Sequence, residues 1–116
     1  MSNEVLELKA GEYVMRDGEE STQMYYLQSG SLAVYKLKGG AEQQIGTIYS
    51  GELVGEMSFL DKQPRSASVK AIGECKLLVI PHDKFEKYFQ DQPAWYKALI
   101  NTLLERLRKA NTRIRI

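Results

Sequence analysis

The chain has 116 residues, 43% of them hydrophobic, which is the size of one ordinary domain with its own core. Its 16 basic and 15 acidic side chains nearly cancel, which argues against a protein dedicated to coating nucleic acid or a membrane surface. Charges interrupt every apolar run well short of a membrane span of roughly 20 residues, so we expect no membrane contact. The lone Cys75 and a start without signal-peptide features predict a mature, cytoplasmic protein.

Up to Ile80, short apolar runs alternate with glycine, which is typical of an antiparallel sandwich or barrel. The turn signals Asp17-Gly18, Ser29-Gly30 and Lys38-Gly39-Gly40 each predict a tight reversal, since glycine reaches positive φ at little cost. We predict seven strands, over residues 5–8, 13–16, 24–28, 32–37, 43–49, 67–72 and 76–80.

Two helices are predicted after residue 80. The first carries Phe85, Tyr88 and Phe89 on one face, and the second begins near Pro93 with Asp91 as a candidate cap. The second helix ends the chain without a closing glycine, which favours a fragment of a longer protein. Its apolar stripe is too short to distinguish packing on the chain's own sheet from formation of a homodimer, and it contains Tyr96, Ile100, Leu103, Leu107, Ala110 and Ile114.

The segment from Gly55 to residue 67 has the features of an anion site. Gly55 lets the backbone approach a bound group, and a short helix from about Glu56 would direct the amides of Met57 and Ser58 at an anion. Arg65 supplies a planar fork that matches two phosphate oxygens. A phosphate would repel Glu56 unless that carboxylate faces a donor such as a ribose hydroxyl. The segment therefore predicts a site for phosphate joined to ribose.

The segment resembles the phosphate-binding segment of the cyclic nucleotide-binding domains found in bacterial catabolite activators, protein kinase A regulatory subunits and cyclic nucleotide-gated channels. That pattern is Gly-Glu, a small residue two places after the glutamate, and then Pro-Arg-small-Ala. The matching residues are Gly55, Glu56, Ser58, Pro64, Arg65, Ser66 and Ala67. The resemblance implies one domain over residues 1–116: a mainly β, jelly-roll-like antiparallel β-roll over about 5–80, with a short phosphate-site helix, and helices over about 82–116.

The resemblance also implies roles for individual residues. Glu56 would bind the ribose 2′-hydroxyl and Arg65 an exocyclic phosphate oxygen. The amides of Met57 and Ser58, with the hydroxyl of Ser66, would bind the remaining phosphate oxygens, and Ala67 would complete the ligand-binding segment. The last helix would cover the base near Ala110, Asn111 and Thr112. The implied ligand is cyclic AMP, with cyclic GMP as the alternative, and no cofactor or metal is expected.

We therefore predict a cytoplasmic, bacterial-type regulatory sensor that binds cyclic nucleotide reversibly and transmits binding through its C-terminal helix. It is either the regulatory domain of a longer protein with an output domain or a small stand-alone receptor. It is not expected to be an enzyme, because His82 is interpreted as a helix-start residue and Cys75 as an inert thiol. Ser68 is expected to point outward on its strand.

Three alternatives stay open. The first is a β-roll scaffold that binds no nucleotide and signals by helix association. The second is a nucleic-acid module, because residues 105–115 carry five basic side chains against one acidic. The third is an enzyme acting on a nucleotide, which the absence of a paired base or a metal cluster in the sequence disfavours.

Overall fold

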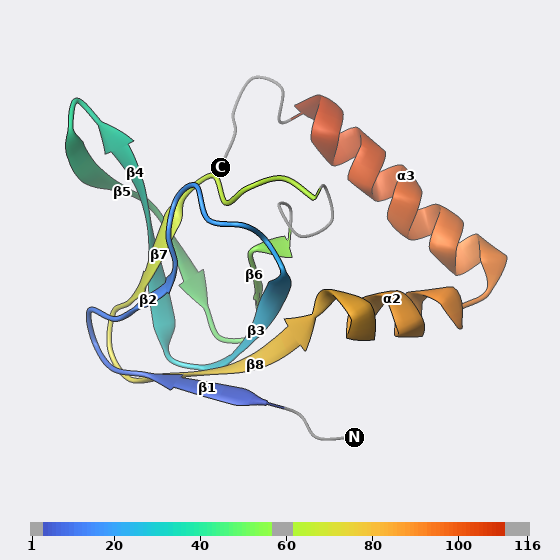
Figure 1. Cartoon of the computed structure of the whole chain (residues 1–116), viewed down its shortest axis with the longest axis horizontal. Coiled ribbons are helices and arrows are strands. Elements are labelled where there is room, and N and C mark those ends of the chain that lie inside the picture. The colour runs from blue at the N-terminus through green and yellow to red at the C-terminus, as the bar shows by residue number, and fades with distance from the viewer. Residues whose placement is uncertain (1–3, 57–61, 111–116) are drawn as a thin grey trace.

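A computed structural model describes residues 4–56 and 62–110 (Figure 1). It contains two four-stranded antiparallel sheets, with strand orders β1-β8-β3-β6 and β2-β7-β4-β5. This confirms the predicted β-roll followed by helices. The elements are β1 Val5–Leu8, β2 Tyr13–Met15, β3 Gln23–Ser29, β4 Ser31–Lys38, β5 Ala41–Tyr49, β6 Leu53–Val54, β7 Ser68–Ala71, β8 Cys75–Pro81, α2 His82–Gln90 and α3 Ala94–Ala110.

All seven predicted strands are present, and β1 has the predicted bounds. The structure adds β6, a two-residue strand that pairs with β3 through Tyr25↔Val54 and Tyr26↔Leu53. A strand of two residues is too short to show the alternation of apolar and polar side chains from which strands are predicted. β6 nevertheless matters for the candidate site, because it leads directly into Gly55 and Glu56.

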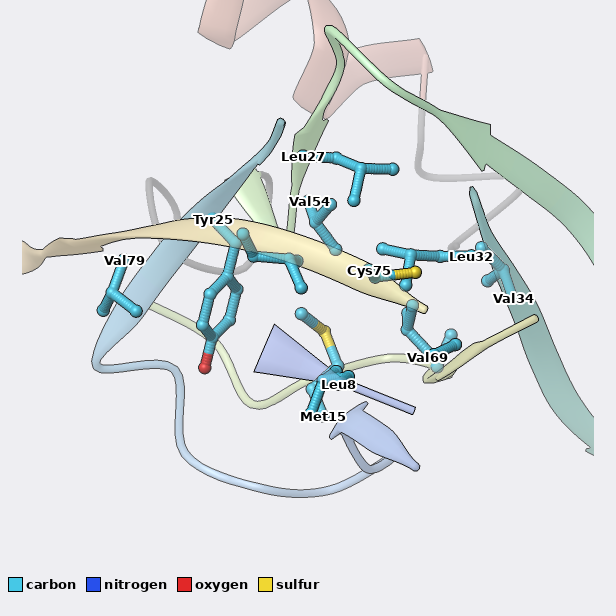
Figure 2. Close-up of a cluster of buried hydrophobic side chains, with 13 residues drawn as sticks. Leu8, Met15, Tyr25, Leu27, Leu32, Val34, Val54, Val69, Cys75 and Val79 are labelled. Carbon is cyan, nitrogen blue, oxygen red and sulfur yellow. The ribbon is translucent and has the colours of Figure 1, made fainter. Parts of the chain in front are cut away.

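The core lies between the two sheets, and seven of the strands contribute to it. Figure 2 shows the cluster of buried hydrophobic side chains, which come from β1, β2, β3, β4, β6, β7 and β8. Cys75 belongs to this cluster and is only 2% exposed, and its thiol donates to the carbonyl of Ser31 at 3.2 Å. The most deeply buried large side chains are Leu27, Leu32, Val54 and Leu77. This interior gives the strands fixed positions from which the connecting loops present polar groups.

The two helices follow the β-roll in the chain, and α2 begins directly after β8. The first amide of α2, that of His82, donates to the carbonyl of Thr22 at 3.2 Å, and the rings of Phe85 and Phe89 stack at 5.7 Å. One detail of the prediction is wrong: Asp91 is the C-terminal cap residue of α2 and does not cap α3. The amide of Tyr96 instead donates to the carbonyl of Pro93 at the start of α3.

The apolar stripe of α3 does not pack on the sheets of its own chain. Within α3 only Leu104 is buried, whereas Tyr96, Leu103 and Leu107 are 39%, 47% and 48% exposed. Figure 1 shows α3 at the upper right of the view, apart from the strands of both sheets. Of the two interpretations of the stripe, packing on the chain's own sheet is therefore not observed, and Ile114 lies outside the described residues. Neither helix among the described residues is long and apolar enough to cross a membrane.

The turn between β3 and β4 can contain only glycine at position 30. Gly30 has φ +93°, and a Cβ atom there would lie 2.5 Å from the carbonyl oxygen of Glu74 and 2.8 Å from Sγ of Cys75. Gly18 has a similar φ of +89°, but a Cβ atom there would meet nothing within 4 Å.

We therefore expect Gly30→Ala to lower the free energy of unfolding by about 3 kcal/mol and Gly18→Ala by only about 1 kcal/mol. The two variants share the backbone strain, so their difference isolates the steric collision. Urea unfolding of both proteins would measure it. Equal destabilisation would show that the close approach of Cys75 to this turn is not significant.

Candidate functional site

The backbone of Arg65 is held on both sides by the loop that follows β2. The amide of Arg65 donates to the carbonyl of Glu19 at 2.8 Å, and its carbonyl accepts from the amide of Gly18, also at 2.8 Å. The Arg65 residue is only 4% exposed, so this cation lies inside the fold. Burying a charge is costly unless it is hydrogen-bonded, and the surrounding backbone supplies such bonds.

The guanidinium of Arg65 bridges two segments that lie far apart in the sequence. Nη1 donates to the carbonyl of Gly55 at 2.9 Å, and Nη2 donates to the carbonyl of Gln23. Burial lowers the pKa of Arg65, while Tyr25, Glu19 and Glu56 oppose this effect electrostatically. Arginine nevertheless remains protonated in proteins, so the site keeps a positive charge.

Gly55 has no room for a side chain. Its φ is +75°, and a Cβ atom there would collide with Nη1 of Arg65 and lie 2.8 Å from Cε of Met15. From the sequence, Gly55 was expected to let the backbone approach a bound group closely. The structure adds that the group approached within the protein is the guanidinium of Arg65. The two ends of the predicted segment therefore meet in space.

Glu56 is half-buried, has helical backbone conformation and lies within electrostatic range of Arg65. Burial raises the pKa of the Glu56 carboxyl above its ordinary value of 4.5, a hydrogen bond with its own backbone lowers it, Glu52 raises it and Arg65 lowers it. Because burial outweighs the attraction to Arg65, ionised Glu56 is less stable here than in water. A carboxylate in this position gains from an added hydrogen-bond donor.

The other predicted site residues fall into two groups. Ser66 is half-buried and Ala67 is buried, directly after Arg65 in the chain. Four further predicted ligand-binding residues lie outside the described residues, namely Met57, Ser58, Asn111 and Thr112. The structure thus brings together Gly55, Glu56 and Arg65, with Ser66 and Ala67 adjacent.

The sequence profile of the family described as "Cyclic nucleotide-binding domain" matches residues 5–92. The chain belongs to this family. It is 31% identical over 84 residues to the cAMP-dependent protein kinase regulatory subunit of Emericella nidulans, covering 72% of this chain and 20% of the fungal protein. The chain thus spans only a fifth of the length of that relative.

Two solved structures of similar fold agree with this membership. The catabolite activator protein of Thermus thermophilus has a TM-score of 0.78 and 27% identity, covering 97% of this chain and 53% of that one. The regulatory domain of Toxoplasma gondii PKA with cAMP has a TM-score of 0.70 and 28% identity, covering 73% of this chain and 33% of that one. This cyclic nucleotide-binding domain therefore has the fold expected from its sequence.

The orientation of Ser68 differs from the prediction, and one set of backbone contacts around Arg65 was not predicted. Ser68 was expected to point outward, but it is only 9% exposed and its Oγ accepts a hydrogen bond from the amide of Asp17 at 3.0 Å. Both faces of β7 are covered at this point, so alternation along the strand does not identify a solvent-facing side. The missed contacts are those of Gly18, Glu19 and Gln23, which act through backbone atoms and leave no side-chain signature.

Side chains that could bind a metal ion are dispersed over the described part of this cyclic nucleotide-binding domain. Residues 4–56 and 62–110 contain no cluster of three His, Cys, Asp or Glu side chains that could hold a metal ion. His82 is the first residue of α2, as predicted, with Nε2 3.9 Å from Oε1 of Glu86 on the next turn.

The raised pKa of Glu56 predicts a pH-dependent effect of Glu56→Gln on stability without ligand. Because the folded-state pKa lies above the unfolded value, the proton on Glu56 contributes stability that is complete below pH 4.5 and is lost as pH rises through the folded-state pKa. Glutamine cannot ionise. We therefore expect the stability of Glu56→Gln relative to the unmodified protein to increase between pH 4 and pH 7.

Urea unfolding at pH 4, 5.5 and 7 measures this difference, with Glu20→Gln as a control at an exposed carboxyl. The control should show a smaller pH dependence. A flat difference for Glu56→Gln over the whole range would contradict the burial of an ionisable Glu56 beside Arg65.

Proposed function

We propose that this chain is a sensor that binds cyclic AMP reversibly, with cyclic GMP as the alternative ligand, and transmits binding through α3. The observation that carries the proposal is the buried cation of Arg65, fixed within hydrogen-bond distance of Gly55 and within electrostatic range of Glu56. A phosphate and a ribose hydroxyl are the two chemical groups that this pair of side chains recognises best.

The phosphate is assigned to Arg65. A guanidinium in a partly desolvated position interacts more strongly with an anion than the same group in water, because the local dielectric is lower. Its contacts with the carbonyls of Gly55 and Gln23 pre-orient the fork before the ligand arrives. We assign the remaining phosphate oxygens to the amides of Met57 and Ser58 and to the hydroxyl of Ser66, with Ala67 beside them.

The ribose is assigned to Glu56. Its carboxylate is destabilised by burial and by Glu52, so a hydroxyl donor from the sugar stabilises the ionised form. The proposed arrangement assigns the acidic group to the sugar and the neighbouring Arg65 to the phosphate. Cyclic nucleotides, in which ribose and phosphate are joined in one rigid unit, match this combination.

Two of the relatives support cyclic AMP as the proposed ligand. The similar fungal protein is a regulatory subunit of a cAMP-dependent kinase, and the similar Toxoplasma domain was solved with cAMP. Ser66 is compatible with either base. Asn111 and Thr112 remain the proposed contacts on the base side.

Transmission is assigned to α3 because its apolar stripe is exposed in the single chain. A ligand that binds better when α3 covers the base shifts the population toward that arrangement, and the shift is limited by the difference in affinity. The stripe would then be presented to, or withdrawn from, a second copy of the chain or an output domain. The proposed activity is binding without chemistry, in the cytoplasm, where the buried Cys75 stays reduced.

Removing the Arg65 guanidinium should weaken cyclic AMP binding by on the order of 100-fold, which corresponds to roughly 2.7 kcal/mol. Arg65→Lys keeps the charge without the bidentate fork, so we expect an intermediate loss. Calorimetric titration of Arg65→Ala, Arg65→Lys and the unmodified chain measures the series.

Lys76→Ala is the matched control, because it removes one exposed positive charge, that of the surface pair with Glu7, and should bind normally. Circular dichroism must show that each variant is folded, since Arg65 also donates to two backbone carbonyls. Unchanged affinity in folded Arg65→Ala would remove the phosphate assignment. Absence of heat from the unmodified chain with both nucleotides would support the non-binding scaffold.

Loss of the Glu56 carboxylate should reduce discrimination between ribose and 2′-deoxyribose. The unmodified chain should bind 2′-deoxy cyclic AMP about tenfold more weakly than cyclic AMP, because a hydrogen bond to a charged group contributes about 1.5 kcal/mol. Glu56→Gln should bring the two affinities closer together. If the variant discriminates as strongly as the unmodified chain, the ribose is bound by another group.

A further inference from the structure

The pairing of β2 with β7 is irregular and is followed by a contact beyond the end of β2. The register shifts between the pairs Tyr13↔Lys70 and Met15↔Val69. Further along, the amide of Asp17 donates to the side-chain Oγ of Ser68 at 3.0 Å. The hydroxyl of Ser68 therefore holds the loop after β2 against the start of β7.

The same loop fixes Arg65 directly. One residue beyond Asp17, the amide of Gly18 donates to the carbonyl of Arg65, and the next residue, Glu19, accepts the amide of Arg65. Glu19 is itself anchored, because its carboxylate accepts the amide of Arg16 at 2.6 Å. Both backbone polar groups of Arg65 are thus held by a three-residue loop whose first residue is tied to Ser68.

We propose that Ser68 is a positioning residue for Arg65, acting through the loop 17–19. The inference rests on the proposed function, in which Arg65 binds the phosphate of a cyclic nucleotide. Ser68 is the first residue of β7, three residues after Arg65. It contacts the loop that holds the backbone of Arg65. Its effect is to fix where the guanidinium is presented.

The hydrogen bond between Ser68 and Asp17 matters because Ser68 is buried. Ser68 is 9% exposed and lies between the buried residues Ala67 and Val69. If the position required only apolar packing, alanine would suffice. A buried hydroxyl is retained at low cost only when it is hydrogen-bonded, and here its described partner is the amide of Asp17. Without that acceptor, water around the exposed Asp17 would compete for the amide, and the loop that holds Arg65 would lose one of its attachments.

A small displacement of Arg65 is enough to affect binding. Directional bonds between a guanidinium and a phosphate weaken when the fork is moved or tilted. The loss of one ordinary hydrogen bond from the supporting loop corresponds to about a fivefold change in an equilibrium constant. We therefore expect Ser68→Ala to weaken cyclic AMP binding about fivefold, much less than removal of the guanidinium itself.

The first test is calorimetric titration of cyclic AMP against Ser68→Ala, Ser68→Thr and Ser29→Ala. Ser68→Thr keeps the hydroxyl and should restore most of the affinity. Ser29→Ala removes an exposed hydroxyl at the end of β3 and should bind like the unmodified chain. The ³¹P chemical shift of the bound nucleotide should change in Ser68→Ala and stay constant in Ser29→Ala, which a general loss of stability would not produce.

A second variant removes the donor in place of the acceptor, in case Ser68→Ala does not fold. Semisynthesis with an ester in place of the Asp17 amide removes that N–H group at an exposed loop residue, and it also weakens the Arg16 carbonyl, which accepts the amide of Glu19. The ester should therefore weaken binding by at least the factor of about five expected for Ser68→Ala. Adding Ser68→Ala to the ester variant should have no further effect, because the N–H group that Ser68 binds is already gone.

The outcomes separate this inference from the proposed function. If the unmodified chain binds cyclic AMP and the folded Ser68→Ala and ester variants bind equally tightly with an unchanged ³¹P shift, the positioning role is wrong and the proposed function stands. Additive effects of the two changes would also overturn it. If the unmodified chain binds neither cyclic nucleotide, the proposed function fails, and the positioning role fails with it.

Discussion

The burial of one guanidinium constrains the rest of the candidate site. A cation that is 4% exposed must have its donors and backbone groups satisfied by the fold, and Arg65 receives these contacts from three separate segments of the chain. Gly55 must lack a side chain because the guanidinium occupies that space. The loop after β2 must stay close to β7 because it holds the backbone of Arg65. Local sequence features that look independent are thus consequences of one buried charge.

The β-roll supplies the rigidity that such a site requires. Strands of both sheets meet in a common core, so the ends of β2, β3, β6 and β7 are fixed relative to one another (Figure 2). The same strands deliver Gly55, Gln23 and Arg65 to one place. The helices differ, because α2 begins with a hydrogen bond to Thr22, next to Gln23, whereas α3 leaves the roll with most of its apolar stripe exposed. In the proposed function, the strands hold the ligand and α3 is the element that responds.

The sequence was sufficient to predict most of the fold, because alternation and glycine turns are local signals that seven strands display. It also identified the segment that contains Gly55, Glu56 and Arg65, which the structure brings together, although their roles toward a ligand remain predictions. The sequence was insufficient where the determining contact is not local. β6 is only two residues long, Ser68 is buried by a loop 51 residues away, and Gly18, Glu19 and Gln23 contribute only backbone atoms. Asp91 was misassigned because a residue between two adjacent helices can cap either one.

A crystal structure of the chain with cyclic AMP would test most directly whether Arg65 binds the phosphate and Glu56 the ribose of a cyclic nucleotide. We predict phosphate oxygens within hydrogen-bond distance of the Arg65 guanidinium and the 2′-hydroxyl within hydrogen-bond distance of the Glu56 carboxylate. A nucleotide bound elsewhere, or one whose phosphate faces solvent while Arg65 contacts only the carbonyls of Gly55 and Gln23, would contradict it.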